Sequence, residues 1–384
     1  MRLRLLLAVV VSPSSPSPAP VSPEGETIRL IVLFGGMSAE HDVSCTTAAQ
    51  VLAAVDPARY EIEAVGITRH GAFVRADEAM AALAQGARHL PPALSPQGPS
   101  TELTALVAAP SRATRTVVLP LLHGPMGEDG TVQGMLDLAN VPYVGAGVLG
   151  SALAMDKAMA KTVAAAHGIP QARWLSFREC DIAADPKAVM KAVADQLGLP
   201  VFVKPANMGS SVGVSKATTE TELAAAIHKA LVYDELVVIE EAIRGREIEL
   251  SVLGNLEPEV SVPGEIVAGA EFYDYDDKYL DGNAQLIIPA QLPPGVTEEL
   301  QALSATVYRA LRIEGMARVD FFYEENGRGP LLNEVNTIPG FTPISMYPKM
   351  WEASGLPYAR LIDRLVELAI ERHDRRSAKR VTTH

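Results

Sequence analysis

Residues 315–342 read GMARVDFFYEENGRGPLLNEVNTIPGFT. Apolar runs on either side of the polar YEENGRG stretch predict two strands, and side chains two positions apart in a strand share one face of a sheet. Arg318 and Asp320 therefore share a face of the first strand, while Glu334 and Asn336 share a face of the second. The apolar side chains between them predict that the opposite face packs into a core.

The polar face of these two strands combines a cation, two carboxylates and an amide. Oxygen ligands of this kind suit Mg²⁺. A single pair is explained at least as well by a cross-strand salt bridge on a half-exposed sheet, whereas two pairs in neighbouring segments favour a magnesium site. The TIPGFT segment that follows, residues 337–342, contains a proline and a glycine that can turn a backbone N–H toward a ligand.

The composition is that of a multidomain globular protein. A chain of 384 residues is long enough for two or three domains, and 48% hydrophobic and 21% charged residues exclude disorder of the whole chain. The formal net charge is -13 and basic residues are scattered, so a nucleic-acid partner is not expected. Cys45 and Cys180 suit neither a disulfide scaffold nor zinc, which fits a reducing cytosol.

The first 26 residues differ from the remainder. Arg2 and Arg4 precede a short apolar run, residues 5–11, and a Pro/Ser-rich stretch follows. A signal peptide has this general pattern, but the apolar run is short and no convincing cleavage site follows it. The composition favours a disordered extension over 1–26, or a misassigned start.

Three folded units are expected after this extension. The first alternates near-continuous apolar strands with helices, which predicts a parallel sheet. Its expected strands are 27–34, 60–68 and 116–122. The three units are expected to span residues 27–146, 147–243 and 244–375, and a tail follows at 376–384.

The second unit contains a glycine- and hydroxyl-rich loop, KPANMGSSVG at residues 204–213, directly after an apolar strand. Backbone N–H groups in such a loop can cradle phosphate. The spacing is not that of a Walker A loop, and alone the segment fits a plain hairpin turn equally well. Lys157 and Lys204 are candidates for contacts with phosphate oxygens, although for Lys157 a solvated surface position is an equal alternative.

Two motifs of the first unit lie at strand ends, GGMSAEH at 35–41 and HGPMGEDG at 123–130. Ligands of open α/β sheets bind at the carboxyl ends of strands, so Glu40 and His123 are expected to face one crevice. A lone histidine in a turn is nevertheless more often structural. In the third unit, EFYDYDDKYLD at 271–281 predicts a mobile lid, with an exposed acidic loop as the alternative.

Taken in order, these segments resemble the D-alanine–D-alanine ligase family over residues 28–372. The resemblance is carried by GGMSAEHDVS, HGPMGEDGTVQG, ANMGSSVGVSK, FYDYDDKY, and the pair ARVDFF and NEVNTIPGFT. It implies an α/β plus α+β fold: an N-terminal parallel-sheet domain that binds substrate, followed by a two-domain ATP-grasp fold. It also implies ATP-dependent ligation of two D-alanines through a D-alanyl phosphate and a tetrahedral intermediate, for peptidoglycan precursor synthesis.

The resemblance further implies which residues bind ATP and metal. ATP would lie between the central and C-terminal domains, and two Mg²⁺ ions, or Mn²⁺ in their place, would accompany it. The metal ligands would be Asp320, Glu334 and Asn336. The nucleotide would contact Lys157, Lys204, Ser210, Ser211, Val212, Gly213, Glu240, Ile243 and Glu247.

Substrate and catalytic residues are implied in the same way. Glu40 and His123 would hold the first D-alanine, Lys278 would reach the phosphoryl group, and Ser345 and Met346 would border the second D-alanine. The catalytic residues would be Glu40, Ser210 and Tyr279, which close the lid, and Arg318 with the Gly340 N–H, which stabilise the oxyanion.

The resemblance also separates competing functions. Tyr279 is typical of members that make the dipeptide and not D-alanyl-D-lactate. Another carboxylate–amine ligase would lack GGMSAEH, HGPMGEDG and the KY of the lid. A nonenzymatic ATP-binding relative would lack Arg318 or a metal ligand. A secreted binding protein would need the leader as a signal peptide. Some relatives carry lysine at the position of Glu241, so no contact between Glu241 and the nucleotide is assigned. A cytoplasmic homodimer without a membrane partner is expected.

Overall fold

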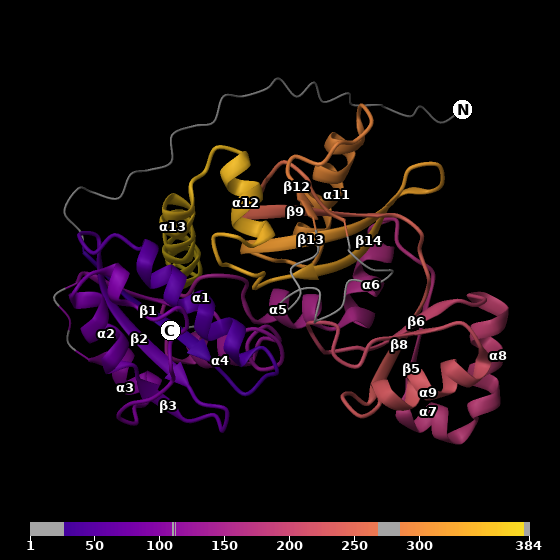
Figure 1. Cartoon of the computed structure of the whole chain (residues 1–384), viewed down its shortest axis with the longest axis horizontal. Coiled ribbons are helices and arrows are strands. Elements are labelled where there is room, and N and C mark those ends of the chain that lie inside the picture. The colour runs from indigo at the N-terminus through magenta and orange to yellow at the C-terminus, as the bar shows by residue number, and fades with distance from the viewer. Residues whose placement is uncertain (1–26, 110, 112, 268–284, 380–384) are drawn as a thin grey trace.

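The computed structural model describes residues 27–109, 111, 113–267 and 285–379, which form three β-sheets with surrounding helices (Figure 1). The expected leader and the expected lid, including Lys278 and Tyr279, lie outside the described residues. Among the helices that the structure describes, none combines the length and apolar character needed to cross a membrane.

The N-terminal sheet has the strand order β3-β2-β1-β4. Strand β1 pairs in parallel with β2 and β4, as predicted, and β1 is buried along its whole length because helices cover both faces. Strand β3 adds an antiparallel edge that the sequence analysis did not foresee. The elements are β1 (Ile28–Gly35), α1 (His41–Ala54), β2 (Tyr60–Ile67), β3 (Phe73–Arg75), α2 (Asp77–Ala84), η1 (Ala87–His89), α3 (Leu103–Ala108), β4 (Arg115–Pro120) and α4 (Thr131–Leu138).

The central sheet has the order β5-β8-β6-β7 and is entirely antiparallel. Strands β6 and β7 form a hairpin, and the glycine- and hydroxyl-rich loop is their connection, an arrangement that is compatible with both interpretations of that loop. The elements are β5 (Trp174–Arg178), α7 (Glu179–Ala184), α8 (Pro186–Gln196), β6 (Val201–Pro205), β7 (Ser215–Ala217), α9 (Glu220–Ala230) and β8 (Leu236–Glu241).

The third sheet has the order β12-β11-β9-β13-β14, with β10 beside β9. Strands β13 and β14 are antiparallel neighbours that place Asp320 opposite Glu334 and Arg318 opposite Asn336, so the predicted polar face forms. The elements are β9 (Arg246–Gly254), β10 (Glu259–Val260), β11 (Gly264–Val267), β12 (Gln285–Ile287), α11 (Val296–Ala310), β13 (Gly315–Glu324), β14 (Gly329–Asn336), α12 (Met346–Ala353) and α13 (Tyr358–Ser377).

Two helices at the start of the second unit pack against the third sheet. Ala160 and Ala164 of α6 (Lys157–Ala166) share an apolar cluster with Leu300 of α11 and Val335 of β14. Ala154 of α5 (Val148–Met155) joins the same cluster. The first part of the second unit, residues 148–166, therefore packs against the third unit.

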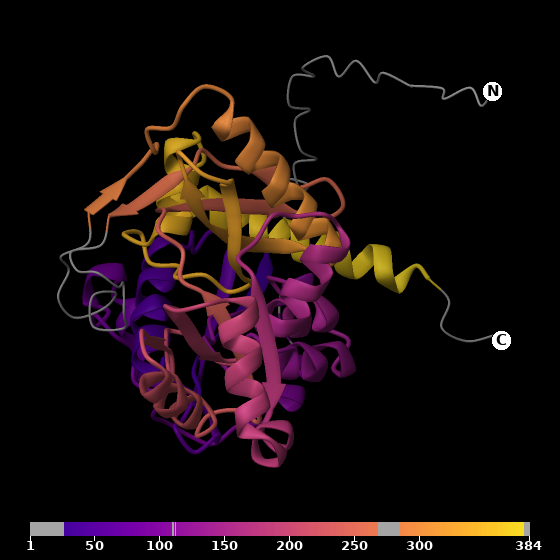
Figure 2. The ribbon, with the colours of Figure 1, turned by 90° about the vertical axis from the view of Figure 1, so that its right-hand side faces the viewer.

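Helix α13 joins the third sheet to the N-terminal sheet (Figure 1). The Tyr60 hydroxyl donates a hydrogen bond to Asp363 at 2.8 Å, and Arg372 Nη2 donates one to the Tyr143 carbonyl at 2.7 Å. Figure 2 shows the C-terminal part of the helix projecting from the body of the protein. Because α13 ends at Ser377, the first two residues of the expected tail are helical.

Candidate active site

A cavity of about 1090 Å³ lies between the three sheets. Loops of the N-terminal sheet contribute Glu40 and His123, the central sheet contributes Lys204 and Glu240, and the third sheet contributes Asp320. Segments distant in the sequence, carrying charges of both signs, therefore meet around one space.

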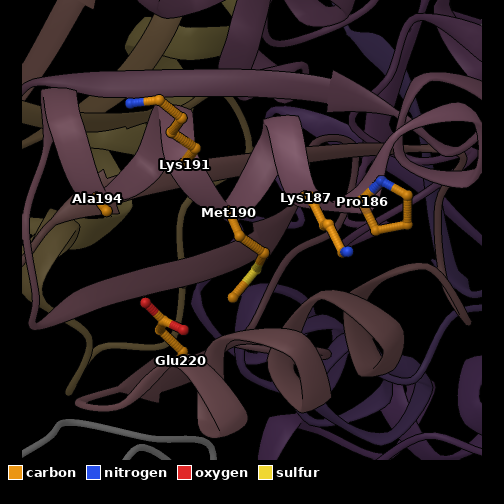
Figure 3. Close-up of a pocket in the computed structure, with 6 residues that line it drawn as sticks. All are labelled: Pro186, Lys187, Met190, Lys191, Ala194 and Glu220. Carbon is orange, nitrogen blue, oxygen red and sulfur yellow. The ribbon is translucent and has the colours of Figure 1, made fainter.

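A second, smaller depression lies on the surface between α8 and the start of α9 (Figure 3). Its two lysines are Lys187 and Lys191, and Lys191 already pairs with Asp195 at 2.6 Å. None of the residues implied in substrate or nucleotide binding lines this depression, so we assign it no function.

The loop between β6 and β7 contacts the N-terminal sheet through Ser210 and Glu40. The Ser210 hydroxyl donates a hydrogen bond to the Glu40 carboxylate, which is buried just before α1. Ser210 and Ser211 adopt φ values of 48° and 58°, a left-handed conformation that non-glycine residues rarely adopt. Two of the three residues expected to close the lid are therefore in contact, and the third, Tyr279, lies outside the described residues.

His123 is buried beside Glu40 and Glu128. Its Nδ1 lies 3.0 Å from the Ile338 carbonyl, while Nε2 has no hydrogen-bond partner within the described ranges. Burial alone would lower the pKa of His123, but the carboxylates of Glu128 and Glu40 raise it above its ordinary value. The ring is thus fixed through one nitrogen, and the other has no protein partner in the described structure.

The two lysines expected at phosphate both line the cavity. Lys157 Nζ donates a hydrogen bond to the Met208 carbonyl at 2.5 Å, and Lys204 Nζ lies 3.2 Å from Glu240 and 3.4 Å from the Asn333 amide oxygen. Burial lowers the pKa of Lys157. Lys157 is therefore half-buried at the cavity, and its contact with phosphate stays a prediction.

The other residues expected at the nucleotide are only partly brought together. Ser210, Ser211, Glu240, Ile243 and Glu247 line the cavity. Their loop neighbours Val212 and Gly213 do not line it, although Val214 and Lys216, further along the same hairpin, do.

Sequence reasoning missed Lys161, a buried lysine beside Glu240. Lys161 Nζ lies 3.4 Å from Glu240 Oε1, and both side chains are almost completely buried. Burial alone would raise the pKa of Glu240, but Lys161 and Lys204 hold it below the ordinary value. Lys161 follows Lys157 by one helical turn, and this spacing was the available signal.

On the third sheet, Arg318 binds two carboxylates. Its Nε and Nη2 each lie 2.8 Å from an oxygen of Asp320, and Nε lies 3.1 Å from Glu249 Oε2. Burial alone would lower the pKa of Arg318, but Asp320 and Glu249 hold it well above its ordinary value. Glu249, which faces Asp320 from β9, was not foreseen either.

The expected metal ligands form a small oxygen-rich set. Throughout the described part of the chain, no group of three or more His, Cys, Asp and Glu side chains is arranged for a metal ion. The expected set has two carboxylates, Asp320 and Glu334, and the amide of Asn336, whose Nδ2 lies 2.9 Å from Asp320. Mg²⁺ usually needs one or two carboxylates when phosphates and water complete its shell. The donors therefore fit Mg²⁺ beside a nucleotide, provided that Arg318 loosens its contact with Asp320.

The TIPGFT segment and the start of α12 form the remaining wall. Gly340, Ser345 and Met346 all line the cavity. The Ser345 and Thr342 hydroxyls lie 2.8 Å apart, and the Thr342 N–H donates to Ser345 at 3.2 Å. A Cβ at Gly340 would lie 3.2 Å from Ser345 Oγ, so the turn leaves little room for a side chain there.

Three sheets around a cavity lined by lysines, carboxylates and a serine-containing hairpin define an ATP-grasp enzyme. Family models described as D-ala D-ala ligase N-terminus and D-ala D-ala ligase C-terminus match residues 29–146 and 163–367. The chain belongs to the D-alanine–D-alanine ligase family, and the predicted fold class and resemblance are confirmed.

Individual relatives agree over nearly the full chain. A D-alanine–D-alanine ligase of Caldicellulosiruptor bescii is 45% identical over 349 residues, covering 90% of this chain and 96% of the relative. The structure of the D-alanine–D-alanine ligase from Coxiella burnetii superposes with a TM-score of 0.77 at 38% identity, covering 92% and 97% of the two chains. That of the Bacillus anthracis ligase complexed with ATP gives 0.67 at 28% identity, covering 91% and 99%.

Proposed function

We propose that this protein joins two D-alanines into D-alanyl-D-alanine, with ATP converted to ADP and phosphate. The observation that carries the proposal is that Glu40 from a loop of the N-terminal sheet, Lys204 from β6 and Arg318 from β13 line the same cavity. The membership of the chain in the ligase family supports this reaction. The product would supply peptidoglycan precursor synthesis in the cytoplasm.

The first D-alanine would bind at the N-terminal side of the cavity. The buried Glu40 carboxylate, oriented by Ser210, suits an ammonium group, and His123 beside it suits a carboxylate. Tyr279 of the lid would complete this end of the site, and Lys278 would reach the phosphoryl group, as the resemblance implies.

The first step transfers the γ-phosphoryl group of ATP to the D-alanine carboxylate. A carboxylate oxygen forms a bond to the γ-phosphorus while the bond to the leaving ADP oxygen breaks, so positioning and charge neutralisation supply most of the catalysis. Lys157 and Lys204 would neutralise the phosphate oxygens. To do so, Lys204 would give up its 3.2 Å contact with Glu240 and contact a phosphate oxygen in its place. Mg²⁺ held by Asp320, Glu334 and Asn336 would neutralise further phosphate charge.

In the second step, the amine of the second D-alanine attacks the acyl carbon and phosphate leaves. Arg318 and the Gly340 N–H would stabilise the oxyanion of the tetrahedral intermediate, and each such donor is worth about 3 kcal/mol. Ser345 and Met346 would border the carboxylate of the second D-alanine. Water must be excluded from the closed site, because it would hydrolyse the acyl phosphate.

Product analysis tests the proposal. Wild-type protein with ATP, Mg²⁺ and D-alanine should release phosphate and form D-alanyl-D-alanine, identified by mass spectrometry. Parallel reactions with D-alanine plus D-lactate or D-serine measure the strictness of the second site. Phosphate release that needs a different amino-acid pair, with none from D-alanine, would overturn the substrate assignment and leave the fold intact.

We also propose a homodimer. The family resemblance implies this state, and the apolar side chains of Leu138 in α4, 91% exposed, and Leu149 in α5, 46% exposed, are available for an interface to cover. Light scattering should give twice the chain mass for the wild type and the single-chain mass for Leu138→Asp. A monomeric wild type would contradict the proposal.

A further inference from the structure

Lys161 lies behind the wall of the cavity. It is on α6, one turn after Lys157, and is 3% exposed. Lys157 and Glu240 line the cavity, whereas Lys161 does not. Lysines are almost never this deeply buried without a charged partner, so the partner of Lys161 indicates its role.

That partner is Glu240 of β8. Lys161 Nζ lies 3.4 Å from one carboxylate oxygen of Glu240, and Lys204 Nζ lies 3.2 Å from the other. Within the described residues Lys161 Nζ has no hydrogen-bond partner, so the ion pair with Glu240 is what compensates its burial. Breaking such a buried pair leaves an uncompensated charge.

The two lysines differ in what they are free to do. Lys204 lines the cavity, so it can turn toward a phosphate, as the proposed function requires. Lys161 has no such path, because its side chain is enclosed and does not line the cavity. When Lys204 leaves, Lys161 is the cation that stays beside Glu240.

We propose that Lys161 is a positioning residue for recognition of the nucleotide base, holding Glu240 as an acceptor for the exocyclic amine of adenine. The inference rests on the proposed function, in which ATP binds this cavity, and on the family resemblance, which implies that Glu240 and Glu247 lie at its adenine and ribose. A carboxylate fixed in this way accepts a hydrogen bond from the 6-amino group of adenine and repels the 6-carbonyl oxygen of guanine. Lys161 thereby contributes to base specificity without touching the nucleotide.

The test compares ATP with purine riboside 5′-triphosphate, which lacks the 6-amino group. Dissociation constants are measured by competition against a fluorescent nucleotide, without D-alanine, so that binding is read independently of ligation. Wild-type protein should prefer ATP by about tenfold or more, because a hydrogen bond to a charged acceptor contributes on that scale. In Lys161→Met the preference should fall toward one.

The matched control is Gln171→Leu. Gln171 Nε2 donates a hydrogen bond to the Lys161 carbonyl at 2.8 Å, so this variant disturbs the same part of α6 and keeps the amine. Its preference for ATP should equal that of the wild type. If Lys161→Met caused only a general packing defect, it would weaken the binding of both nucleotides equally and leave the preference for ATP at its wild-type value. That result would overturn the proposal.

If Lys161→Met does not fold, the comparison moves to Glu240→Gln and to the double variant Glu240→Gln/Lys161→Met, which removes both charges of the buried pair. The two should show the same reduced preference, because Lys161 acts through the Glu240 charge. A further change in the double variant would overturn the inference. Wild-type protein that prefers ATP but forms no dipeptide would refute the proposed ligation and leave the role of Lys161 standing.

Discussion

Arg318 and Asp320 form a bidentate ion pair on one face of β13, with both contacts at 2.8 Å. Asp320 is also an expected metal ligand, and Arg318 is the expected oxyanion donor. The contact therefore joins the two functions: metal binding at Asp320 has to compete with the guanidinium, and the guanidinium becomes available as the metal binds.

Arg318→Ala should separate these two functions. We expect kcat to fall by about 10²- to 10³-fold, which is typical of losing an oxyanion donor, and Mn²⁺ to bind more tightly because Asp320 is released. Electron paramagnetic resonance of free Mn²⁺ measures the second effect. Arg309→Ala removes an equal charge at an exposed position of α11 and should change neither quantity. Unchanged or weaker Mn²⁺ binding in Arg318→Ala would refute the competition.

Ser210→Gly tests the contact with Glu40. Glycine adopts the φ of 48° at this position without strain, so the loop should keep its conformation while the hydroxyl is lost. The KM for the first D-alanine should rise about tenfold, as expected for a lost hydrogen bond to a charged group. Steady-state kinetics at saturating ATP measures it, with thermal melting as the check on folding. An unchanged KM would show that Ser210 does not orient Glu40.

Glu128→Gln should lower the pKa of His123, because Glu128 is the main group that raises it. Because the pKa of His123 is raised in the folded state, its protonation stabilises the protein. This stabilisation is fully present when the pH is below the ordinary pKa of 6.5, and it is lost as the pH rises through the folded-state pKa. The wild type should therefore exceed the variant in stability by more at pH 5.5 than at pH 9.

Urea unfolding at the two pH values, together with NMR titration of the His123 ring, checks this difference. Glu102→Gln, at an exposed position, should show no such pH dependence. A His123 pKa that is the same in the wild type and in Glu128→Gln would contradict the assignment.

Glu241 connects the central and third sheets at the rim of the cavity. Its carboxylate accepts hydrogen bonds from the Arg173 N–H at 2.8 Å and from Arg328 Nη1 at 2.6 Å. Partial burial alone would raise the pKa of Glu241, but these partners lower it to about 2. The stabilisation is present above the ordinary value of 4.5 and is lost as pH falls toward 2.

Glu241→Gln should cost less than about 1 kcal/mol at pH 7, because both arginines are substantially exposed and the pair is screened by solvent. Urea unfolding at low and high NaCl measures the loss, which salt should shrink. Glu235→Gln, at a more exposed carboxylate paired with Arg178, should change stability still less. A loss that persists in 1 M NaCl would point to packing and not to charge.

Arg372→Ala should destabilise the protein strongly. Arg372 is buried, donates to the carbonyls of Tyr143 and Gly145, and lies over the Tyr143 ring with its guanidinium carbon 4.4 Å from the ring centroid. Removing it leaves two buried carbonyls unpaired, at about 2–5 kcal/mol in total. Arg376→Ala, one turn later and exposed, should cost under about 1 kcal/mol in the same urea unfolding experiment. Equal losses in the two variants would show that α13 is not anchored through Arg372.

The parts of the fold that follow local rules were predictable from sequence. The two-residue spacing of Arg318 and Asp320 predicted their shared face, because it depends on strand periodicity alone. The alternation of apolar strands with helices predicted the parallel pairing of β1. Most of the described residues that the family motifs pointed to line the cavity, with Val212 and Gly213 as exceptions.

The residues that were missed depend on pairings between distant segments. Lys161 looks like an ordinary polar position on a helix until β8 brings Glu240 against it, and Glu249 gains its partner only through the register of β9 with β13. The same holds for Arg372, whose acceptors lie more than 200 positions earlier in the chain. Sequence periodicity carries no information on such contacts.

The central claim is that a D-alanine carboxylate is phosphorylated in the cavity between the three sheets. The most direct test uses D-alanine labelled with ¹⁸O in the carboxylate, together with ATP and Mg²⁺. Attack of the carboxylate on the γ-phosphorus, followed by displacement of phosphate by the second amine, predicts one ¹⁸O atom in the released phosphate and D-alanyl-D-alanine in equal amount. Phosphate that is released without ¹⁸O would contradict the account, because the oxygen would then have come from water.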